Sequence, residues 1–293
     1  MFFNGLRSAL PGTLSTYFGK GRLAVNKFLV ILGSGYTARF VPPLAEPRYA
    51  RVLATSREPD RHLRHIQTDR RIRFDLTQQD TWRNIPTNAD LLWCFPAAPL
   101  DLIKAFAGTV EPYSRRLVVL GSTSAYTVGG SSDYPPAWID ETAPIDLAQP
   151  RVQGEEFLRA NYSATILRVA GIYGPGRNPL DWIKSGRVGP SRKYVNLIHV
   201  EDLAAICLAG LERGRPGEAY NVSDGTPRTW KDICEAAEYR WNIAPISSSK
   251  PDDNRGKRIA IAKLSKNLHD TLQYPDLYKA LDGMMASGDT RPY

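Results

Sequence analysis

Short runs of apolar residues recur along the first 170 residues of the chain, and more polar segments separate them. The runs predict β-strands at Phe28–Leu32, Arg51–Thr55, Ile72–Phe74, Asp90–Phe95, Leu117–Leu120 and Thr165–Val169. Most of them are continuously apolar, which is typical of parallel strands that are covered on both faces. Helical segments lie between several strands, for example at Leu100–Thr109 and Gln153–Asn161. This alternation predicts an α/β fold with a doubly wound parallel sheet and right-handed crossovers.

The pattern changes after Ala170, where proline and glycine become frequent and the expected helices are short. We therefore predict three parts: a basic leader of unknown role (1–26), an α/β core (27–170) and a smaller lobe (171–293). Residues 195–225 are expected to return to the core, so the small lobe is partly interleaved with it.

A glycine-rich turn follows the first predicted strand directly. Gly33-Ser34-Gly35-Tyr36-Thr37-Ala38 has the pattern G-x-G-x-x-A, with a small third residue. The first glycine permits a tight strand-to-helix turn, and the second lets a pyrophosphate approach the backbone. The phosphates are expected at the N-terminus of the following helix. The motif predicts that the core (27–170) is a Rossmann fold that binds a dinucleotide, and the lobe (171–293) is then expected mainly to bind the substrate. An ordinary tight turn of another α/β protein is the alternative.

The end of the second strand bears on the choice of cofactor. NAD sites usually place Asp or Glu about 20 residues after the glycines, where the carboxylate binds the ribose 2′-hydroxyl. This chain has Ser56 and Arg57 there and no carboxylate. An arginine can pair with a 2′-phosphate through several donors. We therefore predict NADP as the cofactor, with NAD as the alternative, unless Arg57 is only a surface residue of a basic segment.

Two further strand ends are expected to contact the cofactor. After the third strand, Asp75 is placed to accept a hydrogen bond from the adenine amino group, although it is equally suited to cap the next helix. After the fourth strand, small residues leave room for the cofactor along the sheet edge. The complete predicted cofactor site is Gly33, Ser34, Gly35, Tyr36, Thr37, Ala38, Ser56, Arg57, Asp75, Leu76, Pro96, Ala97, Ala98 and Ser122.

Charge and composition narrow the class of protein. The net charge is +8 and the pI is near 9.4, which favours anionic ligands. Residues 48–73 hold eight arginines, which we interpret as a solvated basic face.

No apolar run is long enough for a membrane span. Cys94, Cys207 and Cys234 lie far apart in apolar segments and are expected as buried thiols in a reducing compartment, and no metal site is expected. The leader lacks acidic residues, so organelle import is an alternative to a cytoplasmic location.

Several further motifs follow one another between residues 27 and 285. They are Leu120-Gly-Ser-Thr-Ser-Ala-Tyr126, Ile166-Leu-Arg-Val-Ala-Gly-Ile-Tyr-Gly-Pro-Gly-Arg177, Asn196-Leu-Ile-His-Val-Glu-Asp202, Ala219-Tyr-Asn-Val-Ser-Asp-Gly225 and the segment from Gly256-Lys-Arg258 to Tyr274-Pro-Asp-Leu-Tyr278. In this order the motifs resemble the extended and atypical short-chain dehydrogenase/reductases, which include the NAD-dependent epimerase/dehydratase group. The last segment is similar to small bacterial sugar-nucleotide epimerase-like proteins. The Tyr173–Arg177 loop is expected on the substrate side of the cofactor pocket.

The resemblance implies a catalytic trio of Ser or Thr, Tyr and Lys, of which only the first is found. Thr123 falls on the Ser/Thr position, where it would orient a substrate oxygen. No tyrosine has a lysine four residues later; Arg151 and Glu155 fall near the expected places. Arg151 cannot replace the phenol as a proton donor but is suited to bind an acidic substrate.

Other polar residues have weaker claims to a role. Tyr126 and Tyr134 are candidate replacement acids, although a structural hydrogen bond is the more frequent role of a buried phenol. His199 is expected to make a structural contact at a strand–helix junction, and Asp202 to be a helix N-terminal charge. Arg255, Lys257 and Arg258 are candidates to hold a substrate phosphate, but an exposed basic loop is the favoured interpretation.

The sequence therefore predicts an NADP(H)-binding oxidoreductase or epimerase that acts on a small hydroxylated or sugar-derived substrate, for which an anionic group is compatible with the basic chain. A non-catalytic NADP(H)-binding regulatory or scaffold protein is one alternative. An RNA-associated member of the family is a second, less favoured alternative. A homodimer is compatible with the sequence, and no membrane partner is expected.

Overall fold

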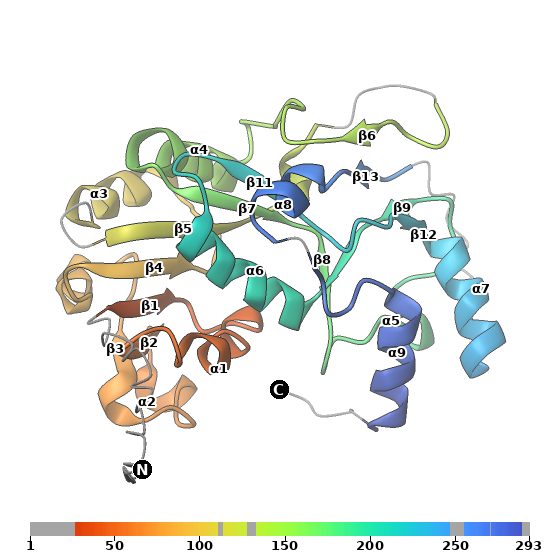
Figure 1. Cartoon of the computed structure of the whole chain (residues 1–293), viewed down its shortest axis with the longest axis horizontal. Helices are drawn as coiled ribbons and strands as arrows, with labels where there is room; N and C mark the ends of the chain where they lie inside the picture. Colours follow the sequence, from red (N-terminus) through yellow and green to blue (C-terminus); the bar gives the residue numbers. More distant parts are fainter. Residues whose placement is uncertain (1–26, 111–113, 128–132, 247–254, 270, 289–293) are drawn as a thin grey trace, which may run out of the picture.

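The computed structural model describes residues 27–110, 114–127, 133–246, 255–269 and 271–288. A seven-stranded sheet in the order β11-β7-β5-β4-β1-β2-β3 forms its larger part (Figure 1), and every pair of neighbours is parallel. Its strands are β1 (Phe28–Leu32), β2 (Arg51–Ser56), β3 (Arg71–Arg73), β4 (Ala89–Trp93), β5 (Ser114–Ser122), β7 (Thr165–Val169) and β11 (Ala219–Val222). The predicted doubly wound parallel sheet is confirmed. The basic leader lies outside the described residues.

The remaining strands are short and lie outside the large sheet. They are β6 (Trp138–Ile139), β8 (Gly171–Tyr173), β9 (Tyr194–Val195), β10 (Leu197–His199), β12 (Arg228–Thr229) and β13 (Arg258–Ile259). They pair as β10 with β8, β12 with β9 and β13 with β6. The pairing of β13 with β6 joins two segments that lie more than 100 residues apart in the chain.

The α-helices are α1 (Pro42–Ala45), α2 (Pro59–His62), α3 (Leu100–Val110), α4 (Pro150–Tyr162), α5 (Pro179–Lys184), α6 (Val200–Arg213), α7 (Trp230–Trp241), α8 (Ala262–Asn267) and α9 (Leu277–Ala286). Short 3₁₀ helices are η1 (Thr37–Arg39), η2 (Thr68–Arg70), η3 (Gln79–Asn84) and η4 (Thr123–Ala125). No helix of the described part of the chain has the length and apolarity required to cross a membrane.

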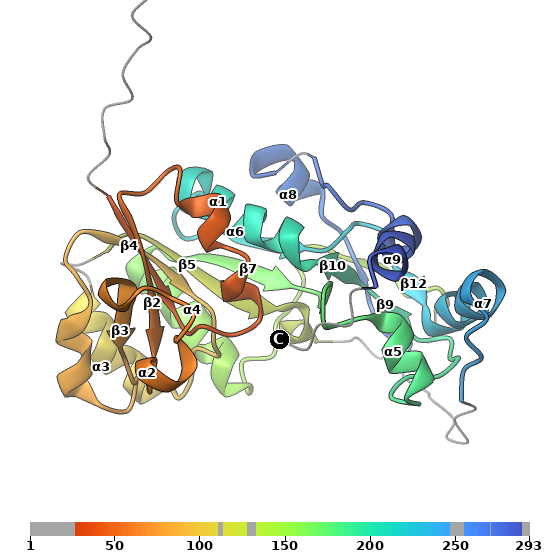
Figure 2. The ribbon, with the colours of Figure 1, turned by 90° about the horizontal axis from the view of Figure 1, so that it is seen from below.

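Two apolar clusters cover the two faces of the sheet, as a buried parallel sheet requires. Helices α3 and α4 pack on one face through residues such as Phe106 and Leu158. Helices α1, α6 and α8 pack on the other face, for example through Ala45, Leu203 and Leu264. Figures 1 and 2 show α3 and α4 on the side of the sheet opposite α1 and α6. The result is a three-layer core whose strands point toward the C-terminal lobe.

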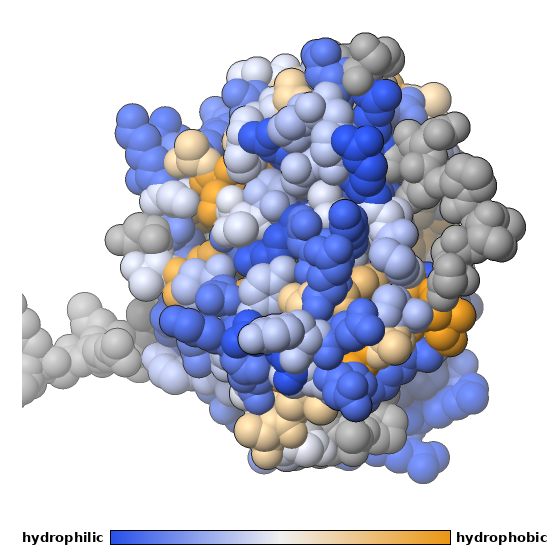
Figure 3. Space-filling view, turned by 90° about the vertical axis from the view of Figure 1, so that its right-hand side faces the viewer, coloured by the Kyte–Doolittle hydropathy of each residue, from blue (hydrophilic) through white to orange (hydrophobic). Residues whose placement is uncertain are grey.

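A third apolar cluster forms the core of that lobe. It includes Tyr173 of β8, Ile183 of α5, Ile233 of α7 and Leu281 of α9, all fully buried. Helix α8 belongs to the range predicted for the lobe, but its Leu264 packs in the cluster on the sheet. Figure 3 shows the outer end of this lobe, which is mostly hydrophilic with small, separated apolar patches.

Side chains at the start of α6 connect the core to the lobe. His199 is buried, accepts a hydrogen bond from the backbone N–H of Glu201 and lies against the ring of Tyr274. Asp202 accepts hydrogen bonds from the backbone N–H groups of Gln273 (2.7 Å) and Tyr274 (2.9 Å). The structural role predicted for His199 is thus observed, and the carboxylate of Asp202 also fixes a distant segment of the lobe.

Cysteine placement follows the prediction in part. Cys207 and Cys234 are buried, whereas Cys94 is partly exposed. Burial raises the pKa of the Cys94 thiol to about 12 and that of the Cys234 thiol to about 11. Such thiols are poor nucleophiles at neutral pH, so these two residues pack as small apolar side chains.

Candidate functional site

A cavity of about 610 Å³ lies where the C-terminal ends of β1, β2, β3 and β4 meet α3. Its lining consists of Gly33, Ser34, Arg39, Thr55, Ser56, Arg57, His62, Phe74, Asp75, Leu76, Thr77, Phe95, Ala98, Pro99 and Leu102. It includes seven of the predicted cofactor residues, namely Gly33, Ser34, Ser56, Arg57, Asp75, Leu76 and Ala98. The edge at the C-terminal ends of parallel strands is where open α/β sheets bind ligands. We call this space the dinucleotide pocket.

The glycine-rich turn is fixed to the end of β2. Gly33 has φ +86°, a conformation that favours glycine, and its N–H donates to Thr55 Oγ1 at 2.9 Å. The hydroxyl of Ser34 donates to the carbonyl oxygen of Thr55 at 2.8 Å. A Cβ atom added at Gly35 would meet no other described residue within 4 Å. The backbone beside Gly35 is therefore open to a ligand, as the motif requires.

The regular helix expected after this turn is not found, and that prediction was wrong. The chain forms the 3₁₀ turn η1 and then the single-turn helix α1. Pro42 and Pro43 have no backbone N–H to donate, so the hydrogen-bond ladder is interrupted four residues after Ala38. A helix this short has little macrodipole, so the turn lacks much of the positive field that usually binds a pyrophosphate.

Several other residues of the predicted cofactor site do not line the pocket. Thr37 and Ala38 of the turn are buried, and after β4 Ala97 is buried while Pro96 is exposed. Tyr36 extends toward the lobe, where its hydroxyl donates to the carbonyl oxygen of Pro175 at 2.8 Å. The glycine-rich turn is thus linked to the Tyr173–Arg177 loop of the lobe.

Asp75 lines the pocket, and it does not cap the next helix, which was the alternative role predicted for it, because η3 begins after Gln78 and has no side-chain cap. Its Oδ1 accepts from the N–H of Thr77 (2.9 Å) and from the Thr77 hydroxyl (2.8 Å). The structure gives Oδ2 no hydrogen bond to a described residue. One carboxylate oxygen thus orders the turn from Asp75 to Thr77, while the other remains for a ligand.

Arg57 differs from the other arginines of residues 48–73 in its partners. Of the eight arginines in residues 48–73, seven bond to acids, an amide or carbonyl oxygens, namely Arg48, Arg51, Arg61, Arg64, Arg70, Arg71 and Arg73. Most of this segment is therefore solvated, as predicted, but acidic partners offset the charge of five of its arginines, so the surface is less basic than the prediction implied. Arg57 has no hydrogen bond or ion pair with a described residue, although it lines the pocket.

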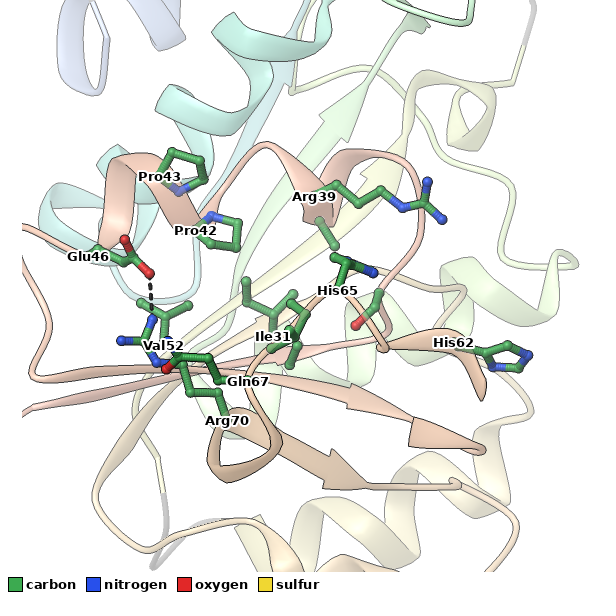
Figure 4. Close-up of a pocket in the computed structure, with 14 residues that line it drawn as sticks. Ile31, Arg39, Pro42, Pro43, Glu46, Val52, His62, His65, Gln67 and Arg70 are labelled. Atoms are coloured by element: carbon green, nitrogen blue, oxygen red, sulfur yellow. Dashed lines mark hydrogen bonds and ion pairs between the residues drawn. The ribbon is translucent and has the colours of Figure 1, made fainter. Parts of the chain in front are cut away.

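Arg39 is a second pocket arginine of this kind, and it was not among the predicted site residues. It forms no side-chain hydrogen bond or ion pair with the described part of the chain, and it lines both the dinucleotide pocket and an adjoining cavity of about 550 Å³. Figure 4 shows the adjoining cavity, in which the Arg39 guanidinium extends away from Pro42 and Pro43 and the ion pair between Glu46 and Arg70 closes the opposite side. Two arginines without acidic partners thus flank the end of β2.

Thr123 lies at the end of β5, in the turn η4. Its side chain is partly exposed, and the hydroxyl of the preceding Ser122 caps the turn by accepting from the N–H of Ser124 at 3.1 Å. Lys257 reaches this turn from the C-terminal lobe and donates to the carbonyl oxygens of Thr123 (3.1 Å) and Tyr126 (2.5 Å). Burial lowers the pKa of the Lys257 ammonium. The favoured interpretation of Lys257 as part of an exposed basic loop was therefore wrong.

The neighbours of Lys257 are also partly buried. The guanidinium carbon of Arg258 lies 4.4 Å from the ring centre of Trp138, and Arg255 donates to the carbonyl oxygen of Asp133. Gly256 packs so closely that an added Cβ would lie 1.9 Å from the carbonyl oxygen of Tyr194. Lys257 is thus held in place by a tightly packed segment.

Tyr126 is buried, and its hydroxyl is fully engaged. The phenol donates to Asn221 Oδ1 at 2.6 Å and accepts from Arg168 Nη1 at 3.0 Å. Burial is the largest influence on the pKa of Tyr126 and raises it, against the lowering effect of Arg168. This arrangement favours the structural interpretation. Tyr134, the other candidate acid, is exposed and donates to the carbonyl oxygen of Arg192 at 3.1 Å.

Helix α4 places Arg151 and Glu155 beside the end of β5. Arg151 donates to Ser124 Oγ at 3.1 Å, and its Nε lies 3.9 Å from Glu155 Oε1. Glu155 is 1% exposed, and a Cβ added at Gly121 would lie 2.6 Å from its Oε2. Burial raises the pKa of the Glu155 carboxyl to about 7, although Arg151 and Arg168 oppose the shift. An arginine–carboxylate pair therefore lies on this helix in place of a tyrosine and a lysine.

We expect the Glu155→Gln variant to flatten the pH dependence of stability. The folded carboxyl has a raised pKa of about 7 against the ordinary 4.5, so the folded state retains a proton that the unfolded state loses. The stability of the wild-type protein therefore falls as the pH rises from about 4.5 to about 7, by up to about 3 kcal/mol. The amide of the variant does not titrate, so this loss should disappear. Urea unfolding between pH 4.5 and 8 measures the free energy of unfolding of both proteins. Glu235→Gln, which removes an exposed carboxylate of α7, is the control. Equal slopes in wild type and Glu155→Gln would contradict the account.

Comparisons with known proteins support the fold and leave the activity open. No family model matches the chain. Protein YeeZ of Escherichia coli (strain K12) is 30% identical over 116 residues, which span 39% of this chain and only 42% of that relative. This likeness covers too little of either protein to transfer an activity.

Solved structures match almost the whole chain. A functionally unknown conserved protein from Silicibacter pomeroyi DSS has a TM-score of 0.71 and 26% identity, with 90% of this chain and all of that one covered. A short-chain dehydrogenase/reductase superfamily protein from Agrobacterium tumefaciens, solved with bound NAD, has a TM-score of 0.72 and 13% identity over 89% and 97% of the two chains.

A third structure adds an epimerase to these neighbours. UDP-glucuronic acid 4-epimerase from Bacillus cereus, also in complex with NAD, has a TM-score of 0.69 and 14% identity over 87% and 96% of the two chains. The structural neighbours are thus NAD-dependent epimerase/dehydratase and short-chain dehydrogenase/reductase superfamily proteins. The resemblance predicted from the sequence is confirmed for the fold.

Proposed function

We propose that this protein binds NADP(H) in the dinucleotide pocket and acts as an oxidoreductase or epimerase on a small hydroxylated or sugar-derived substrate. The observation that carries the proposal is the end of β2, where Arg39 and Arg57 line the pocket and have no acidic partner among the residues that the structure describes. Ser56 and Arg57, rather than a carboxylate, occupy the place that binds the ribose in NAD sites. Neighbours with the same fold were solved with bound NAD, which supports a nicotinamide dinucleotide as the ligand class.

The pocket fits such a cofactor on structural grounds. The open space beside Gly35 can accept phosphates, and Ser56 and Arg57 are placed for the adenosine ribose and its 2′-phosphate. The pocket volume of about 610 Å³ is within the usual range for a ligand site. Arg39 and Arg57 supply a positive charge that suits a phosphate better than a neutral hydroxyl.

We expect the Arg57→Ala variant to lose most of its preference for NADP(H) over NAD(H). Hydrogen bonds to charged groups contribute about 1.5–3 kcal/mol, so NADP+ affinity should fall roughly 10- to 100-fold while NAD+ affinity changes little. Isothermal titration calorimetry with both dinucleotides measures this difference. Arg61→Ala removes an equal charge that is paired with Glu58 and serves as the control. Equal affinities for NADP+ and NAD+ in the wild-type protein would refute the proposed preference.

The chemistry at the end of β5 would depend on Thr123. The cofactor would supply hydride transfer to or from a carbon of the substrate. In this proposal the Thr123 hydroxyl hydrogen-bonds a substrate oxygen. The observation in support is that Lys257 fixes the backbone of the same turn through the carbonyl oxygens of Thr123 and Tyr126. Arg151, held by Ser124, would bind an anionic group of the substrate.

A non-catalytic NADP(H)-binding role is a second candidate function. It is favoured by helix α4, where Arg151 and Glu155 stand in the region expected for the proton-transferring tyrosine and its lysine. An arginine does not release a proton near neutral pH, and Glu155 is buried against Gly121. Tight NADPH binding with no turnover across a panel of carbonyl compounds and sugar nucleotides would support this role over catalysis.

A further inference from the structure

Arg177, at the end of the Tyr173–Arg177 loop, lies over the glycine-rich turn. Its guanidinium carbon is 4.4 Å from the centre of the Tyr36 ring, although the two residues are 141 positions apart in the chain. The side chain is exposed and forms no hydrogen bond or ion pair with any residue that the structure describes. Stacking on an aromatic ring uses the face of a guanidinium and leaves its N–H donors free.

The loop holds Arg177 in this position. Gly174 and Arg177 exchange two backbone hydrogen bonds, of 3.3 Å and 2.8 Å, and the carbonyl oxygen of Pro175 accepts from the Tyr36 hydroxyl. Gly174 has φ +144°, and a Cβ there would meet Tyr36 Oη at 3.0 Å. Both the backbone of the loop and the ring beneath the guanidinium are therefore fixed relative to the glycine-rich turn.

The turn itself lacks the positive field that such turns usually provide. Because Pro42 and Pro43 leave only η1 and the single-turn α1, no long helix directs its N-terminal dipole at the open space beside Gly35. A dianionic pyrophosphate placed there needs compensating charge from another source. Arg39 is available on the side of β2, and Arg177 lies on the side of the lobe.

We propose that Arg177 is a binding residue for the pyrophosphate of the dinucleotide, contributed by the C-terminal lobe and positioned by Tyr36. The proposal rests on the dinucleotide-binding function proposed above and assigns the bridging phosphates to a residue outside the glycine-rich motif. The pyrophosphate is common to NADP+ and NAD+, whereas the 2′-phosphate is not. Arg177 therefore contributes equally to both ligands, in contrast to Arg57.

The test is calorimetric titration of the full chain with NADP+ and with NAD+ in wild type and three variants. Arg177→Gln should weaken both dinucleotides by the same factor, roughly 10- to 100-fold. Tyr36→Leu, which removes the ring but keeps the backbone, should weaken both in the same direction. Arg187→Gln is the matched control, because Arg187 lies over the ring of Trp182 in the same lobe, 5.5 Å from its centre. It should bind like wild type.

Thermal unfolding of each variant shows whether the fold is retained, and Arg177→Lys provides a further variant that keeps the charge. Wild-type affinity in Arg177→Gln would overturn the assignment of Arg177 while leaving dinucleotide binding intact. A loss confined to NADP+ would also overturn it, since the residue would then contact the 2′-phosphate. Failure of the wild-type protein to bind either dinucleotide would instead refute the proposed function, and this inference with it.

Discussion

The Gly35→Val variant is expected to fold normally and to lose dinucleotide binding by roughly 100-fold or more. An added Cβ at Gly35 meets no other described residue within 4 Å, so the folded chain has room for the side chain. The same space is where the pyrophosphate must approach the backbone. Thermal unfolding should give a melting temperature close to that of wild type, while fluorescence titration with NADPH should show little binding.

Gly108→Val is the matched control for this change. Gly108 lies on the exposed side of α3, and an added Cβ there also meets open space. This variant should bind NADPH like wild type. A folded Gly35→Val protein that retains wild-type affinity would show that the phosphates lie elsewhere.

The Gly154→Ala variant should be destabilised by about 3 kcal/mol or more. A Cβ at this position in α4 would lie 1.9 Å from the carbonyl oxygen of Ala97, a backbone atom that cannot move independently. The helix and the segment from Phe95 to Pro99 would have to separate, which would also disturb the wall of the dinucleotide pocket. Urea unfolding compares the free energy of unfolding of the variant with that of wild type.

Gly108→Ala supplies the control in the neighbouring helix α3. Alanine favours helix over glycine by about 0.5–1 kcal/mol, and the open space at Gly108 adds no steric cost. This variant should therefore be slightly more stable than wild type. If Gly154→Ala behaved in the same way, the close contact between α4 and Ala97 would be wrong.

The sheet was largely predictable because its strands are continuously apolar and separated by polar segments. The predicted strands Phe28–Leu32 and Thr165–Val169 coincide with β1 and β7, and the others differ by a few residues at their ends. Strand β11 was not among the predicted strands. It is only four residues long and places Tyr220 and Asn221 between apolar Ala219 and Val222, so its local pattern is weak.

The regular helix predicted after the glycine-rich turn does not form. The motif itself predicts a helix, but Pro42 and Pro43 follow within a few residues and stop it, because neither has a backbone N–H to donate. The local sequence contained the information in this case.

The place of Arg57 after the second strand was enough to predict it, but other features of the site could not be found from local sequence. Arg39 stands out only because the neighbouring arginines bond to other groups, which depends on the folded arrangement. Lys257 reaches Thr123 across 134 positions, and Arg177 reaches Tyr36 across 141. Contacts of this kind depend on how the C-terminal lobe packs against the sheet, and no spacing in the sequence indicates them.

A crystal structure of the full chain soaked with NADP+ tests the central proposal most directly. The account predicts density for the dinucleotide in the pocket, with the pyrophosphate beside Gly35, the 2′-phosphate within hydrogen-bond distance of Arg57 or Arg39, and the nicotinamide near Thr123. An empty pocket at a saturating NADP+ concentration, or a dinucleotide whose phosphates lie away from Gly35, would contradict it.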